Sequence, residues 1–288
     1  MLSTIKNYLP LFKFRICSFI TFSAVVGLIS TSPINISASH ILALIVVTMM
    51  ASAGASMFNH YFDMDIDGVM QRTKKRPMPS DRIGDSKVIL LTAVGIFIIS
   101  ILLSYKILNY MAGLHLFLGG FVYAVVYTIW LKRRSWLNIV IGGLAGSFAV
   151  LAGGASATPE LCLPPVLLAI TMFFWTPSHF WSFAILYKEE YEKAGIPMLP
   201  NVIGDSKTAR YILINTILLV VSSFLPLLFG YFGFFYIAAA VSFGTFFIIR
   251  NIQLLSNISK EIAWKNFKAS MIYLGGLFLA VIIDVITR

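Results

Sequence analysis

Apolar runs of about 20 residues recur nine times along this 288-residue chain. A run of this length crosses the hydrocarbon core of a bilayer as a helix, because 20 residues rise about 30 Å. A hydrophobic share of 58% excludes a soluble domain with one apolar core. We therefore expect one all-α polytopic membrane domain over residues 1–288, with helices near 14–31, 41–59, 88–105, 113–131, 138–157, 162–187, 210–229, 232–249 and 268–287.

The basic residues lie mostly on one side of these predicted helices. The amino terminus and the even-numbered loops hold 20 of the 22 Lys and Arg residues, and ten of the twelve acidic residues lie on the same side. The positive-inside rule places the amino terminus and these loops in the cytoplasm and the carboxyl end outside the cell membrane. The net charge of +10 thus indicates orientation in a bilayer, not binding of nucleic acid.

The stretch 59–79 holds the densest charge in the chain. Asn59, Asp63 and Asp67 are spaced by four, so they share one face over about 12 Å if the second helix runs on. Mg²⁺ takes oxygen ligands and usually sits on one or two carboxylates plus substrate phosphates. The basic residues that follow suit those phosphates, namely Arg72, Lys74, Lys75 and Arg76.

Two other interpretations of this stretch are open to test. A solvated juxtamembrane loop would also carry basic residues that fix orientation. The order Asp63-x-Asp65-x-Asp67 begins like a calcium-binding EF-hand loop, but Lys74 stands at the twelfth position, where a bidentate Glu is required. We set the calcium interpretation aside.

A short sequence repeat links two parts of the chain. Pro77-Met78 and the segment 83–87 recur, 120 residues later, as Pro197-Met198 and the segment 203–207. Both copies could be helix-start signals, because Asp and Ser are good N-caps. We hypothesise instead two related halves, the predicted helices 2–5 and 6–9.

The same offset from Asn59 leads to His179, close to the predicted cytoplasmic end of helix 6. An ionisable side chain there faces a cavity rather than lipid, where it could bind heme iron, move a proton or bond a neighbour. Lys188, Glu189 and Glu190 follow as a second charge cluster. A solvated helix end explains them, as does a second carboxylate set for two Mg²⁺ ions on a diphosphate.

Other basic residues have a simpler interpretation. Lys13 and Arg15, at the start of helix 1, could snorkel to lipid headgroups or reach a substrate phosphate, and of the two uses we expect snorkelling. Lys132, Arg133 and Arg134 are expected to be orientation signals.

Several segments resemble the intramembrane UbiA-type prenyltransferases, and within them the protoheme IX farnesyltransferase (heme O synthase) family. The similarity covers nearly the whole chain. Its specific segments are Asn59-x-x-x-Asp63-x-x-x-Asp67 with Arg72-Thr73 and Arg76-Pro77-Met78-Pro79, Tyr127 to Arg134, Asn138 to Gly143, Trp175-Thr-Pro-x-His-Phe-Trp181, and Tyr191 to Pro200. Two departures are His60, where members often have Asp, and Glu189-Glu190, which stand for a second Asp-rich motif.

The resemblance implies helices around a central cavity, with Mg²⁺, farnesyl diphosphate and heme b bound and heme O and diphosphate formed. It implies catalytic roles for Asn59, Asp63, Asp67 and His179, and cytoplasmic active-site loops at about 60–87 and 188–209. The diphosphate would be bound by Arg72, Lys75, Arg76 and Lys188, and metal by Asp63, Asp67, Glu189 and Glu190. The allylic cation or the heme would meet Tyr61, Phe180, Trp181, Tyr187 and Tyr191, and the product could pass to a heme A synthase or a terminal oxidase.

Two alternatives remain at this stage. The acceptor could be a quinone-precursor ring or glycerol phosphate, although the segment around His179 favours heme. A membrane transporter would also have helix repeats and intramembrane polar residues. The carboxylates disfavour it, because they cluster at one membrane face rather than at the midplane.

Overall fold

The protein is described by a computed structural model that covers residues 8–31, 36–80 and 86–288. All regular secondary structure in these ranges is helical. In this part of the chain, nine segments are long and apolar enough to cross a membrane: Leu9–Ile29, Ala38–Phe62, Ser86–Ile107, Tyr110–Leu131, Asn138–Ala157, Leu163–Leu186, Asp205–Leu228, Phe234–Ser256 and Lys260–Thr287. The predicted multi-pass membrane fold is confirmed.

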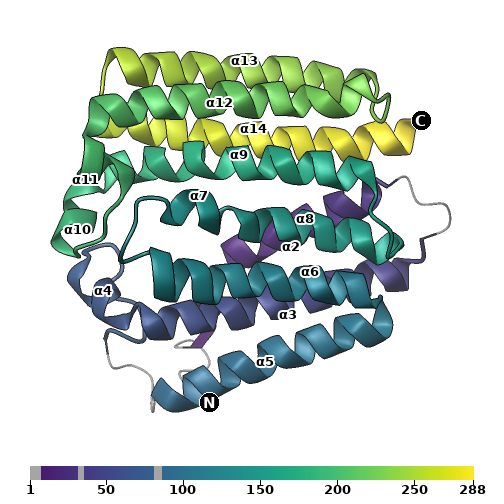
Figure 1. Ribbon diagram of the computed structural model, residues 1–288, viewed down its shortest axis with the longest axis horizontal. Coiled ribbons are helices and arrows are strands. Elements are labelled where there is room, and N and C mark those ends of the chain that lie inside the picture. The colour runs from purple at the N-terminus through teal and green to yellow at the C-terminus, as the bar shows by residue number, and fades with distance from the viewer. Residues whose placement is uncertain (1–7, 32–35, 81–85) are drawn as a thin grey trace.

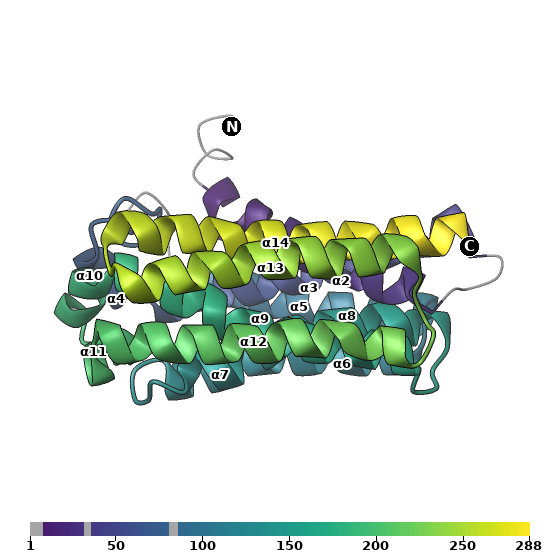
Figure 2. The same ribbon diagram turned by 90° about the horizontal axis from the view of Figure 1, so that it is seen from above.

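Most of these spans are single helices, and they run along the long axis of the molecule (Figures 1 and 2). They are α2 (Phe14–Ile29, preceded by η1, Leu9–Phe12), α3 (Ala38–Phe62), α5 (Ser86–Ile107), α9 (Leu163–Leu186), α12 (Asp205–Leu228), α13 (Phe234–Ser256) and α14 (Lys260–Thr287). Two spans are interrupted: α6 (Tyr110–Phe121) continues as the π-helix η2 (Val122–Leu131), and α7 (Asn138–Gly142) as α8 (Leu144–Ala157).

Three short helices lie together at one end of the bundle, which we call the polar end: α4 (Met64–Val69), α10 (Lys188–Lys193) and α11 (Leu199–Ile203) (Figure 1). The last span also extends further toward this end than predicted, since α14 begins at Lys260 rather than near residue 268. Its start is set by Ser259, whose hydroxyl accepts a 3.2 Å hydrogen bond from the backbone N–H of Ile262.

Two sets of helices pack in the same neighbour order. One set is α3, α5, α6 and α8, and the other is α9, α12, α13 and α14 (Figure 1). The sets differ where they close, because α14 packs directly on α9, whereas α2 packs on both α3 and α8. Residues 83–85 of the short sequence repeat lie outside the described residues, and the structural repeat of two related halves stays a hypothesis.

Close backbone contact fixes α2 against α8. A Cβ atom on Gly27 would lie 2.0 Å from the carbonyl oxygen of Val150, and one on Gly153 would lie 1.7 Å from that of Ala24. No side chain fits at these distances, so glycine is required at both positions. Small residues of this kind let membrane helices approach closely.

At the end of the bundle opposite the polar end, Asp284 joins α14 to the start of α13. Its carboxylate is 1% exposed. It accepts hydrogen bonds from the backbone N–H groups of Gly233 (2.6 Å), Phe235 (3.1 Å) and Tyr236 (3.3 Å). The first backbone donors of α13 are therefore satisfied by a side chain from another helix.

Candidate active site

The Asn/Asp motif occupies the junction between α3 and α4 at the polar end. The helix does not run on without a break, since α3 ends at Phe62 and Asp63 has φ −97° and ψ 6°. Helix-type hydrogen bonds nevertheless cross the junction, from the Asp63 N–H to the Asn59 carbonyl (2.9 Å) and from the Asp67 N–H to the Asp63 carbonyl (2.7 Å). All three motif side chains are buried inside the protein, with exposures of 1–3%.

Each buried carboxylate of the motif is paired with a cation. Lys132 donates to Oδ2 of Asp63, and Nη1 of Arg76 donates to both carboxylate oxygens of Asp67, at 2.9 and 2.7 Å. Nδ2 of Asn59 also donates to Oδ2 of Asp63, at 2.7 Å. Burying these charges without such partners would cost several kcal/mol.

Lys13 is a further member of this cluster. Its Nζ donates to Oδ1 of Asn59 at 2.7 Å and to the hydroxyl of Tyr123 at 3.4 Å. Its backbone has φ 45°, the left-handed region that non-glycine residues rarely adopt, at the point where η1 meets α2. The expectation that Lys13 snorkels to lipid headgroups was wrong, because its side chain points into the protein.

The π-helix η2 supplies the wall opposite α3. Residues four or five apart share a face of a π-helix, because each of its hydrogen bonds spans five residues. This spacing leads from Tyr123 to Tyr127 or Thr128 and on to Lys132, so these side chains share one face. The rings of Tyr123 and Tyr127 stack, with centroids 5.7 Å apart. The hydroxyl of Thr128 accepts a 2.9 Å hydrogen bond from Nδ2 of Asn59.

Lys132 and Arg133, which were expected only to set orientation in the membrane, form specific ion pairs. Lys132 binds Asp63, as described, and Arg133 forms two 2.7 Å hydrogen bonds with the carboxylate of Asp65. These bonds lower the pKa of Asp65 and raise that of Arg133. Asp65 has 64% of its side chain exposed, so this second pair lies on the surface, outside the buried cluster.

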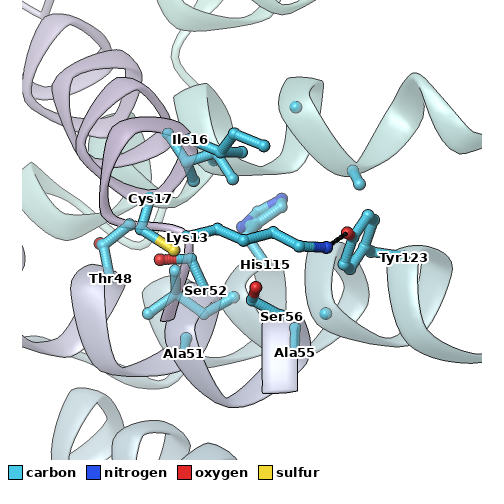
Figure 3. A pocket seen from close by; sticks show the side chains of 17 residues that line it. Lys13, Ile16, Cys17, Thr48, Ala51, Ser52, Ala55, Ser56, His115 and Tyr123 are labelled. Atoms are coloured by element: carbon cyan, nitrogen blue, oxygen red, sulfur yellow. Dashed lines mark hydrogen bonds between the residues drawn. The ribbon is translucent and has the colours of Figure 1, made fainter. Parts of the chain in front are cut away.

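A cavity extends from the buried cluster between α2, α3, α6, η2 and α8 (Figure 3). Its lining includes Lys13, Tyr123 and Ser56, together with Ile20, Thr48 and His115. Most of the remaining lining residues are alanine, glycine or serine. The cavity therefore offers a largely uncharged space that begins at the Lys13 ammonium group.

The second predicted charge cluster is divided among several partners. Lys188 pairs with Asp205 at 3.0 Å, and the exposed Glu189 pairs with Lys260 at 2.8 Å, which lowers the pKa of Glu189. Glu190 accepts a 3.2 Å hydrogen bond from the backbone N–H of Arg72. Of these three α10 residues, the structure brings Glu190 against the 59–79 stretch. Across the described ranges, no three His, Cys, Asp or Glu side chains converge as a metal site.

The predicted phosphate-binding residues also differ in their surroundings. Arg76 lies on Asp67, whereas Lys75 is exposed at the surface. The guanidinium of Arg72 lies over two rings of α9 and the residue after it, 5.1 Å from the centroid of Phe183 and 5.3 Å from that of Tyr187. Arg72 thus connects the motif segment to the second half of the chain.

His179 is buried on α9 between two aromatic rings. Its ring centroid is 4.2 Å from those of both Trp175 and Phe267, in stacked arrangements. Its Nδ1 is 2.7 Å from the hydroxyl of Ser270 on α14. Phe183 lies 5.0 Å from Phe267, so a continuous row of rings leads from the Arg72 guanidinium to His179.

The remaining predicted aromatic residues contribute mainly to packing. Tyr61 packs beside Leu11 near the start of the chain. Trp181 and Tyr191 are buried in the core around α9 and α11, and burial raises the pKa of Tyr191 to about 12. Phe180 meets His179 edge-on, with centroids 5.1 Å apart.

The donor set suits a hard divalent cation at the motif. Oδ1 of Asp63 is buried and has no hydrogen-bond partner, so it can accept a further ligand. Asp67 adds a second buried carboxylate, and Mg²⁺ is commonly held by one or two carboxylates together with phosphate oxygens. His60 is also buried, with Nδ1 3.8 Å from Oδ2 of Asp67.

Comparisons with known proteins identify relatives of this chain and structures of the same fold. Protoheme IX farnesyltransferase 1 of Paramagnetospirillum magneticum is 43% identical over 281 residues, which cover 98% of this chain and 99% of that protein. A solved structure from work on digeranylgeranylglyceryl phosphate synthase shares the fold, with a TM-score of 0.83, 23% identity and complete coverage of both chains. A UbiA homolog from Archaeoglobus fulgidus bound to DMAPP and Mg²⁺ has a TM-score of 0.69 and 16% identity, over 96% of this chain and 99% of that one.

The profile of the UbiA prenyltransferase family matches residues 20–281. This match includes the Asn/Asp motif, most of the cavity lining and the aromatic row that ends at His179, whereas Lys13, Ile16 and Cys17 precede it. The chain belongs to the UbiA prenyltransferase family.

Proposed function

We propose that this protein transfers the farnesyl group of farnesyl diphosphate to a vinyl group of heme b, forming heme O and releasing diphosphate. The observation that carries the proposal is the placement of two buried carboxylates, Asp63 and Asp67, beside a cavity that begins at Lys13. A prenyl diphosphate has the matching parts, a charged head and an apolar tail. The name of the Paramagnetospirillum relative supports farnesyl as donor and heme as acceptor.

In this proposal Asp63 and Asp67 hold Mg²⁺, which would neutralise the negative charge on the departing diphosphate. Glu190 is the acid of the second set that already contacts the motif segment. Glu189 would have to leave Lys260 before it could bind the same metal.

The cations of the cluster bind the diphosphate oxygens. Lys132, Arg76 and Lys13 bond to Asp63, Asp67 and Asn59. With Mg²⁺ held by the two carboxylates, these donors would be free to bind diphosphate oxygens. We assign supporting roles at the entrance to Arg72, Lys75 and Lys188, the last after release from Asp205.

The reaction breaks the bond between C1 of the farnesyl group and the diphosphate oxygen. The heme vinyl group supplies the electron pair for the new carbon–carbon bond, and water adds to the remaining vinyl carbon with loss of a proton. The guanidinium of Arg72 lies over the rings of Phe183 and Tyr187. Ring faces that attract one cation are also suited to stabilise the allylic cation. We place the porphyrin near His179, at the end of the aromatic row.

We further propose that the polar end faces the cytoplasm of the cell, with active-site loops at about 60–87 and 188–209 and the carboxyl end outside. The support is the concentration of Lys and Arg in the amino terminus and even-numbered loops. The product would then enter the bilayer for a heme A synthase or a terminal oxidase.

Mass spectrometry of the products tests this function. Purified protein in lipid nanodiscs is incubated with heme b, farnesyl diphosphate and Mg²⁺, and a parallel sample contains a chelator. A heme O peak that requires the metal is expected. Release of diphosphate with a quinone precursor or glycerol phosphate, and none with heme b, would instead assign another acceptor.

A further inference from the structure

Two cavities meet at His115 on α6. The first begins at the buried cluster and is lined by Lys13, Tyr123 and other residues described above (Figure 3). The second is lined by residues near the opposite end of the bundle, including Leu151, Glu160 and Cys162. Among the described residues that line either cavity, His115 is the side chain that lines both.

The position of His115 gives the first cavity a definite depth. His115 precedes Tyr123 by eight residues on the continuous span α6–η2, a distance of about 12 Å at 1.5 Å per residue. Tyr123 marks the charged end, because its hydroxyl accepts a hydrogen bond from Lys13. The depth is of the order of an extended chain of three isoprene units.

Two contacts hold the ring in place at this depth. Nδ1 of His115 lies 2.9 Å from the carbonyl oxygen of Met111, one turn earlier in the same helix. The ring also packs against Phe148 of α8, with centroids 6.1 Å apart. A ring fixed by both contacts cannot move aside for a longer ligand without losing them.

We infer that His115 is a specificity-determining residue: its ring closes the first cavity and limits the prenyl donor to about the length of farnesyl. The inference rests on the proposed function, since it takes the first cavity as the site of the prenyl tail. Replacement of His115 by a small residue joins the two cavities, and the space then accepts a fourth isoprene unit.

The test is the binding of two non-hydrolysable donors, farnesyl and geranylgeranyl S-thiolodiphosphate, to protein in nanodiscs with Mg²⁺. The wild type is expected to bind the farnesyl compound more tightly, and His115→Ala to shift the ratio of the two Kd values by about tenfold or more toward geranylgeranyl. His115→Phe keeps a ring at this position and is expected to retain the wild-type ratio. If thermal unfolding shows that the alanine variant is not folded, the test is repeated with His115→Val, which also shortens the side chain.

Leu151→Ala is the matched control, because Leu151 lines the second cavity and not the first. Its Kd ratio is expected to equal that of the wild type. An unchanged ratio in folded His115→Ala and His115→Val would overturn the inference while leaving the proposed function intact. Equal loss of selectivity in His115→Phe would also overturn it, since bulk would then not be the cause. If the wild type binds neither the farnesyl nor the geranylgeranyl compound, the proposed function is rejected, and this inference with it.

Discussion

Nζ of Lys13 donates a 2.7 Å hydrogen bond to Oδ1 of Asn59, which joins the start of the first span to the end of the second. The bond fixes the amide of Asn59 so that its Nδ2 faces Asp63. Lys13 therefore orients the Asn/Asp motif and brings a positive charge to the cavity.

Removal of this charge is expected to reduce catalysis. Lys13→Met should lower kcat/KM for farnesyl diphosphate by about 10²–10³, the effect of losing one well-placed donor to a developing anion. Steady-state kinetics in nanodiscs measures the change. Arg15→Met is the control, because Arg15 is exposed two residues away, and equal losses in both variants would contradict the role given to Lys13.

The motif carboxylates provide a second prediction. Asp63→Asn and Asp67→Asn are each expected to abolish turnover and weaken Mg²⁺ binding, since each removes a charged oxygen ligand. Asp65→Asn should retain both properties, because Asp65 is exposed and paired with Arg133. Calorimetric titration with Mg²⁺ in the presence of a prenyl thiolodiphosphate, together with product analysis, separates binding from chemistry. Normal turnover in both motif variants would refute the metal site.

His179 is expected to act on the acceptor side. His179→Ala should raise the Kd for heme b by about tenfold, because the proposed function places the porphyrin at this ring and one aromatic contact contributes about 0.5–1.5 kcal/mol. Heme titration followed by absorbance measures this affinity, and farnesyl thiolodiphosphate binding serves as the control. Lost turnover with unchanged heme affinity would assign His179 to proton transfer instead.

The α2–α8 contact makes a prediction about stability. Gly153→Ala places a methyl group against the Ala24 carbonyl, so we expect it to destabilise the protein by about 1–3 kcal/mol and lower its Tm. Gly275→Ala is the matched control, because a Cβ at this helical position has no neighbour within 4 Å. Thermal unfolding in nanodiscs compares them, and equal Tm values would show that α2 and α8 can separate without cost.

The surface pair of Asp65 and Arg133 should make stability depend weakly on pH. Arg133 lowers the pKa of Asp65 in the folded protein, so the pair stabilises the fold above the unfolded pKa of about 3.9 and loses this effect as pH falls through the lower folded value. Both side chains are substantially exposed, which keeps the contribution below about 1 kcal/mol. The difference in Tm between wild type and Arg133→Gln should therefore be small at pH 7 and decrease in acid, where the 2.6 Å hydrogen bond from Arg133 to the Phe62 carbonyl remains. A difference that grows in acid would contradict this origin.

Local sequence patterns predicted the spans and the motif well, because both depend on spacing within one helix. The apolar runs located all nine spans found in the described residues, and the spacing of Asn59, Asp63 and Asp67 predicted their common side despite the break at Asp63. The partners of the motif were harder to predict. In sequence, Lys13 looks like a snorkelling residue and Lys132 like an orientation signal. Only packing between distant helices turns them toward Asn59 and Asp63.

The π-helix was also beyond reach from sequence. No residue pattern in Val122–Leu131 indicates this hydrogen-bond register, yet the register determines where Tyr123 and Thr128 lie. Within the second charge cluster, Glu189 and Glu190 are adjacent in sequence but face different partners on α14 and the motif segment. Adjacent helical residues point about 100° apart, which explains the division.

The carboxylate of Asp284 also has a consequence for biosynthesis. The helix that it caps, α13, is complete about 28 residues before Asp284 leaves the ribosome, since α13 ends at Ser256. During that interval the N–H groups of Gly233, Phe235 and Tyr236 lack this acceptor. The start of α13 therefore gains its full set of hydrogen bonds only after α14 has been made and has packed against it.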